Sequence, residues 1–67
     1  MMIQFHRGAS NWIAAFEWDG FEVVAFFNRE TGRWYWAKQH LTDLATRSEL
    51  EVLLTEQLKS HIKKESP

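Results

Sequence analysis

The stretch that decides the fold is Trp12–Asn28, WIAAFEWDGFEVVAFFN, in which two apolar-rich runs flank the dipeptide Asp19-Gly20. An Asp-Gly pair between such runs is the strongest short-range signal for a β-hairpin, because a type I′ turn needs positive φ at both central residues. We therefore expect one strand over 12–18 and a second over 21–28. The two-residue loop also sets the register of the pair, because the turn type fixes which residues lie opposite each other.

A second turn is expected in Asn28–Arg33, NRETGR, where a short polar residue and a glycine able to adopt the left-handed conformation favour a four-residue loop. Strand three is then predicted over 33–38. In this register all four tryptophans share one side of the sheet, which we call the tryptophan face: Trp12, Trp18, Trp34 and Trp36. A three-residue loop with a glycine bulge is the alternative, and it would move the last two to the other side.

The hydrophobic period changes from that of a strand to that of a helix in the last third of the chain. Ser48-Glu49-Leu50-Glu51 reads as a capping box, so we expect a helix from about 49 to 64. Five apolar residues form its stripe: Leu50, Leu53, Leu54, Leu58 and Ile62. The first four should pack on the tryptophan face over Ala14 and Ala25. A short separate helical turn is expected from Leu41, Leu44 and Ala45.

These elements predict one α+β domain over residues 1–67, a three-stranded antiparallel β-meander packed against one C-terminal α-helix. The segment Met2–His6 is a candidate fourth strand. A chain of 67 residues without cysteine buries only about 60% of its unfolded surface and has no disulfide to add stability. Oligomerisation is the leading remaining support, and we expect a homodimer.

The side of the sheet opposite the tryptophans, which we call the tyrosine face, is predicted to carry six apolar side chains: Ile13, Ala15, Val24, Phe26, Tyr35 and Ala37. Glu17 and Glu22 lie opposite each other at one end, and Asn28 and Arg33 lie at the other. In a two-fold dimer through this face, Arg33 of one copy would reach the glutamates of the other. The alternative is that Met2–His6 or the Leu41–Thr46 turn folds over this face and completes a monomeric core.

No catalytic, cofactor or metal motif is recognisable. The histidines at 6, 40 and 61 lack metal-ligand spacing, the glycines at 8, 20 and 32 form no phosphate loop, and the serines have no nucleophile context. Glu17 and Glu22 are the one notable carboxylate pair, but a sheet face supplies no cleft for acid–base chemistry. We expect neither enzymatic activity nor a cofactor.

The function predicted from these patterns is a small protein-interaction module, of the kind found among phage-type regulators and inhibitors, that binds a larger protein. Its predicted binding residues are Ile13, Glu17, Glu22, Val24, Phe26, Arg33 and Tyr35. No segment has the length and hydropathy of a membrane span or export signal, so the cytoplasm is the expected compartment and no membrane partner is expected.

Nucleic-acid binding is the alternative function, through Arg29, Arg33, Tyr35 and Lys38, because aromatic rings interleaved with cations stack and steer single strands. The order of three strands and a helix also resembles that of integrase arm-binding domains, which implies a sheet that enters a DNA groove; the resemblance covers only the order of elements. Against it, residues 1–38 are charge-neutral and residues 39–67 carry one net negative charge.

Overall fold

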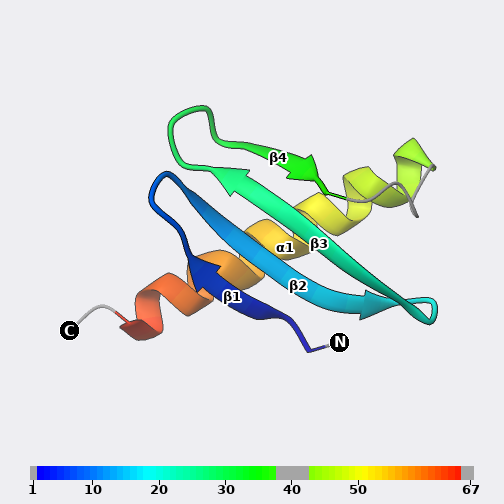
Figure 1. Cartoon of the computed structure of the whole chain (residues 1–67), viewed down its shortest axis with the longest axis horizontal. Helices are drawn as coiled ribbons and strands as arrows, with labels where there is room; N and C mark the ends of the chain where they lie inside the picture. The colour runs from blue at the N-terminus through cyan, green and yellow to red at the C-terminus, as the bar shows by residue number, and fades with distance from the viewer. Residues whose placement is uncertain (1, 38–42, 66–67) are drawn as a thin grey trace.

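The computed structural model describes residues 2–37 and 43–65, and these form a four-stranded antiparallel sheet with one helix packed on it (Figure 1). The elements are β1 (Gln4–Arg7), β2 (Asn11–Trp18), β3 (Phe21–Asn28), β4 (Arg33–Trp36) and α1 (Leu44–Glu65). The strands lie in the sheet in chain order. The predicted α+β fold is confirmed, and the candidate N-terminal strand is present as β1.

The β2–β3 hairpin has the predicted turn and register. Asp19 and Gly20 have φ values of 50° and 81°, which is the pair of positive φ angles that a type I′ turn needs. The pairing runs without a break from Trp18 opposite Phe21 to Asn11 opposite Asn28. Because no bulge interrupts the pairing, side chains alternate regularly between the two faces along both strands.

The β3–β4 connection is the predicted four-residue loop. The Asn28 side-chain oxygen accepts hydrogen bonds from the backbone N–H groups of Glu30 (2.8 Å) and Thr31 (3.1 Å). Gly32, with φ of 71°, donates its N–H to the Asn28 carbonyl at 2.8 Å. Asn28 pairs with Arg33, so the alternative with a glycine bulge is wrong. The strand is shorter than predicted, ending at residue 36, and position 38 lies outside the described residues.

Strand β1 extends the sheet at the edge next to β2, with Gln4 opposite Ala15 and Phe5 opposite Ala14. Ile3 and Phe5 pack against the core on the tryptophan face. The alternative in which Met2–His6 covers the tyrosine face is therefore wrong. Ile3 and Phe5 are two residues apart, and in a strand this spacing places both side chains on the same face as the buried residues of β2.

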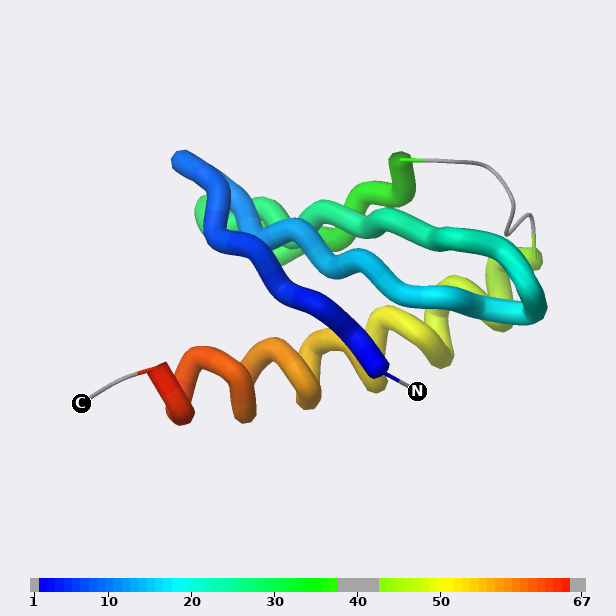
Figure 2. Tube along the Cα trace, turned by 60° about the horizontal axis from the view of Figure 1, so that its bottom comes forward, coloured from blue at the N-terminus to red at the C-terminus, as the bar shows by residue number. Residues whose placement is uncertain are grey.

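Helix α1 lies across the tryptophan face, as Figure 2 shows with the helix on one side of the sheet. Leu50, Leu54 and Leu58 are buried at 3%, 0% and 3% exposure, over Ala14 and Ala25 at 0%. The small alanine side chains of β2 and β3 allow the helix to approach the sheet closely. The central core cluster consists of Ala14, Phe16, Val23, Ala25, Leu50 and Leu54.

The predicted core position of Leu53 is wrong, because this side chain is 39% exposed, and Ile62 at the far end of the stripe is 40% exposed. The buried leucines are spaced four residues apart, so they form a single narrow row on the helix. This row packs into the depression over Ala14 and Ala25, which we call the alanine trough. Leu53 lies about 100° around the helix axis from Leu54 and therefore falls at the border of the contact.

The helix begins earlier than predicted, at Leu44, with Asp43 as its N-cap. One Asp43 carboxylate oxygen accepts the Ala45 N–H at 3.1 Å, and the other accepts the Thr46 hydroxyl at 2.7 Å. These hydrogen bonds, that from Thr46 first, lower the pKa of Asp43 below its usual value of 3.8. The predicted capping box at Ser48 is wrong because Ser48 lies inside the helix, and the predicted separate turn at Leu44 and Ala45 is the first turn of α1.

Candidate functional site

The tyrosine face of the sheet is the candidate site, and its side chains form regular rows across the strands. One row crosses all four strands and contains the larger residues His6, Ile13, Phe26 and Tyr35. The neighbouring row contains Gln4, Ala15, Val24 and Ala37, the last placed beside Val24 by a 3.0 Å hydrogen bond from its N–H to the Val24 carbonyl. We call these the large row and the small row.

The side chains of both rows are partly open to solvent. Tyr35 is 51% exposed, and Ile13, Ala15, Val24 and Phe26 are half-buried. Within residues 2–37 and 43–65 no segment lies over this face, and Figure 2 shows the helix on the opposite side. The other segment considered as a cover for the tyrosine face was Leu41–Thr46. Its Leu44–Thr46 part belongs to α1, and Leu41 lies outside the described residues. The described chain therefore leaves a mainly apolar surface uncovered.

Charged side chains stand at the two ends of the tyrosine face, as predicted. Glu17 and Glu22 are directly opposite each other and exposed. Asn28 and the exposed Arg33 form the last row at the other end. Six residues separate Glu22 from Asn28 along β3, which corresponds to about 20 Å. The structure thus places all seven predicted binding residues on one face.

Two residues on this face, Gln4 and His6, were missed by the sequence reasoning. They pair with Ala15 and Ile13, respectively, and complete the small and large rows at the β1 edge. A signal for them is present in the sequence: Ile3 and Phe5 are apolar and alternate with the polar Gln4 and His6, which is the pattern of a strand with one buried face.

The tryptophan face has a structural role, because its indole groups bind α1. The Trp34 indole N–H donates to the Thr55 hydroxyl at 3.0 Å, and the Trp36 indole N–H donates to a Glu51 carboxylate oxygen at 3.1 Å. Thr55 in turn donates to the Glu51 carbonyl at 2.7 Å. The Trp34 ring also packs on Phe27 with 5.1 Å between centroids. These side chains are used to hold the helix on the sheet.

His61, on the last turns of α1, packs between two aromatic rings, with centroid distances of 5.2 Å to Phe5 and 5.5 Å to Trp12. Its Nε2 lies 3.0 Å from a carboxylate oxygen of Glu65. No group of three or more acidic or histidine side chains in the described ranges is arranged to hold a metal ion. These ring contacts give His61 a packing role between α1 and the sheet.

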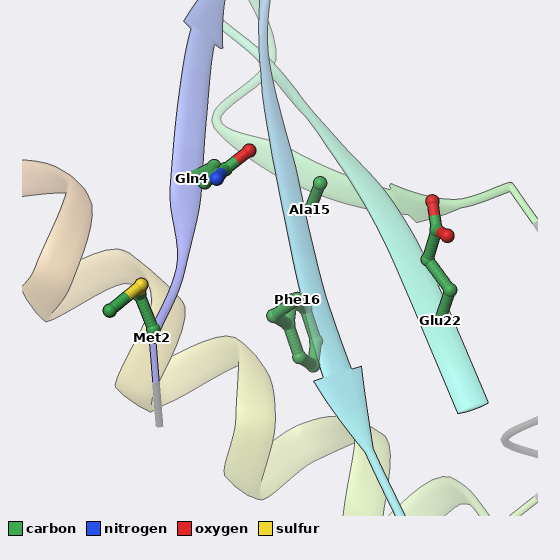
Figure 3. Close-up of a pocket in the computed structure, with 5 residues that line it drawn as sticks. All are labelled: Met2, Gln4, Ala15, Phe16 and Glu22. Carbon is green, nitrogen blue, oxygen red and sulfur yellow. The ribbon is translucent and has the colours of Figure 1, made fainter. Parts of the chain in front are cut away.

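One surface hollow, of about 390 Å³, lies between β4 and α1, and its lining includes Trp34, Glu51 and Lys59. Another, of about 290 Å³, is lined by Met2, Gln4, Ala15, Phe16 and Glu22 (Figure 3). Met2 is 84% exposed, so this side of the hollow is open to solvent, and Glu22 is the sole ionisable side chain in its lining. Glu17 lies directly opposite Glu22 on β2 and is exposed as well, so this carboxylate pair stands on an open sheet face and not in an enclosed cleft.

The cations proposed for nucleic-acid contact are only partly free. The Arg29 guanidinium donates to the carbonyls of Gly8 (3.2 Å) and Ala9, and its backbone N–H donates to the Ser10 carbonyl at 3.2 Å. Arg29 therefore joins the β3–β4 loop to the β1–β2 loop. Arg33 and Tyr35 are exposed on β4, and Lys38 lies outside the described residues.

In the part of the chain that the structure describes, no helix has both the length and the apolar character needed to cross a bilayer. Comparison with protein-family models, with curated proteins and with solved structures finds no match to this chain. The function is therefore inferred from the tyrosine face and its surroundings.

Proposed function

We propose that this protein is a small, non-enzymatic protein-interaction module that acts in the cytoplasm as a regulator or inhibitor and binds its partner through the tyrosine face. The binding residues are those that the sequence indicates: Ile13, Glu17, Glu22, Val24, Phe26, Arg33 and Tyr35. The observation that carries the proposal is an apolar sheet face, with Tyr35 51% exposed, that no described segment covers.

The composition of this face supports a protein partner. Protein interfaces have an apolar centre and a polar rim, and tyrosine, phenylalanine and arginine are enriched in them. Here Phe26 and Tyr35 stand side by side in the large row, and charged groups are confined to the two ends. A rigid sheet also loses little conformational freedom on binding, which favours affinity. A nucleic acid would meet the two exposed glutamates on the same face, and one of the four proposed contacts, Arg29, is already bonded to loop carbonyls.

The test is affinity capture from the native host with the tagged full chain, followed by mass spectrometry. We expect a protein that is retained at raised salt and after nuclease treatment, and that is lost with Phe26→Asp and weakened with Tyr35→Ala. The control is Val52→Asp, because Val52 is 66% exposed on the helix. Circular dichroism of each variant establishes that the fold is kept.

Three results would contradict the proposal. Retention that does not change with Phe26→Asp or Tyr35→Ala would place the binding surface elsewhere on the molecule. Capture of nucleic acid with a steep loss of affinity as salt is raised would support the alternative function, because phosphate contacts release counterions. Turnover of a substrate that is lost on replacement of Glu17 or Glu22 would indicate an enzyme.

A further inference from the structure

We propose that the tyrosine face also binds the tyrosine face of a second copy of this chain, in one defined two-fold arrangement. The inference rests on the proposed function, because it takes this face to be a protein-binding surface, and it names one partner. The evidence is the order of four rows along the strands. From one end to the other they are the Glu17–Glu22 row, the small row, the large row and the Asn28–Arg33 row.

These rows are evenly spaced, because each is two residues from the next along β2 and β3. Two sheets that pack face to face with two-fold symmetry have their axis in the plane between them. If the axis is parallel to the strands, every row meets its own copy. The large row of one copy would then meet the large row of the other, and four carboxylates would gather at one end, which is unfavourable.

An axis perpendicular to the strands reverses the order of rows in the second copy. If it passes midway between the large and small rows, each large row lies over the small row of the partner, so Phe26 lies over Val24 and Ile13 over Ala15. Large side chains over small ones are how packed layers interdigitate. The same axis places the Glu17–Glu22 row over the Asn28–Arg33 row. One position of one axis therefore satisfies both size and charge.

The charge contact should involve Glu22 more than Glu17. This axis places β4 over β4, so Arg33 of one copy lies laterally about one strand spacing, roughly 4.8 Å, from Glu22 and two spacings from Glu17 of the other. Stacked sheets are about 10 Å apart, a gap that an arginine and a glutamate can bridge together. The arrangement also compensates the repulsion between carboxylates held directly opposite each other within one chain.

The size of the face predicts a dimer that dissociates on dilution. Four strands spaced about 4.8 Å apart and seven residues of about 3.3 Å each give a flat footprint on the order of 400 Å². Counted on both copies this is about 800 Å², below the roughly 1,200–2,000 Å² of stable interfaces and in the range of weak, transient ones. A larger protein that uses the same face has to displace the second copy. The apparent affinity of that protein for this chain should therefore fall as the concentration of this chain rises.

The experiment is sedimentation equilibrium of the purified full chain from micromolar to millimolar concentration. We expect wild type to pass from monomer to dimer, and Arg33→Glu and Glu22→Arg each to weaken dimerisation by about tenfold or more, as loss of a close charge pair does. The double variant with both changes should restore it, because the reversed charges meet again across the interface. Glu49→Arg, the same charge change on the exposed side of the helix, should have no effect.

If the double variant does not restore dimerisation, the single charge reversals act through the fold of each chain and not across the interface. That result overturns the arrangement. A wild type that stays monomeric throughout overturns the dimer but leaves the proposed function intact if host capture still depends on Phe26. A dimer that persists with Phe26→Asp shows that the face is not used for self-association and overturns the inference.

Discussion

Replacement of Leu54 with alanine removes the side chain at the centre of the contact between α1 and the sheet. Leu54 is 0% exposed, and the loss of three buried carbons costs about 2.4 kcal/mol in transfer free energy. A cavity adds to this cost where the walls cannot close. The walls here include Ala14 and Ala25, whose backbones are fixed by the pairing of β2 with β3. We therefore expect a loss of about 3–4 kcal/mol in the free energy of unfolding.

The size of this effect should be easy to measure. A 67-residue chain has a total stability of roughly 3–10 kcal/mol at the usual value per residue, so a loss of this size removes a third or more of it. With an m-value of about 1 kcal/mol/M, the urea midpoint should fall by about 3 M. Unfolding is followed by tryptophan fluorescence and by helical circular dichroism, at one fixed chain concentration because of the proposed dimer.

The matched control is Leu53→Ala, the same chemical change one residue away. Leu53 is 39% exposed, so its replacement should cost at most about 1.5 kcal/mol, the buried share of the same transfer free energy. If Leu53→Ala cost as much as Leu54→Ala, the orientation of α1 on the sheet described above would be refuted. A cost below about 1 kcal/mol for Leu54→Ala would show that this side chain is not the centre of the core.

Three further changes test other parts of the fold, each by urea unfolding. Thr55→Val leaves the Trp34 indole N–H without its acceptor and should cost about 1–2 kcal/mol; an unchanged midpoint would contradict a structural role for this bond. Gly20→Ala should cost about 1–2 kcal/mol for its positive φ alone, because no atom lies within 4 Å of the added methyl group; a smaller cost would indicate a turn of another type. Asp43→Ala should lower the urea midpoint through loss of the helix cap. Because folding lowers the pKa of Asp43 from 3.8, the ionised carboxylate stabilises the fold above about pH 4. The difference in stability between wild type and Asp43→Asn should therefore disappear as the pH falls through the folded pKa. A difference that persists at low pH would contradict this.

The sheet could be predicted from the sequence because its turns carry unambiguous chemistry. Asp19-Gly20 fixes a two-residue turn, and Asn28 with Gly32 fixes a four-residue loop, and between them they set the register of three strands. With the register known, alternation assigns each side chain to a face. The seven residues of the candidate site were placed together in this way, and the structure confirms their common face.

The helix was predicted less well because its signals compete. Ser48 with Glu51 satisfies the spacing of a capping box, whereas the cap actually used, Asp43, has Thr46 in place of the glutamate or glutamine of that motif. Nothing between them breaks a helix, so α1 continues through Ser48. Likewise, Leu53 and Leu54 both fit an apolar stripe, and only the width of the alanine trough decides between them. That width depends on tertiary packing and is not encoded locally.

The closure of the sheet core by residues of the C-terminal helix has a consequence for synthesis of the chain on the ribosome. The sheet residues are translated first, yet their core is closed by Leu50, Leu54 and Leu58, which follow later. A nascent chain that ends before Leu50 therefore presents the bare tryptophan face to solvent. We therefore expect the core to form only after the helix has been synthesised, and fragments that stop at residue 43 to be prone to aggregate.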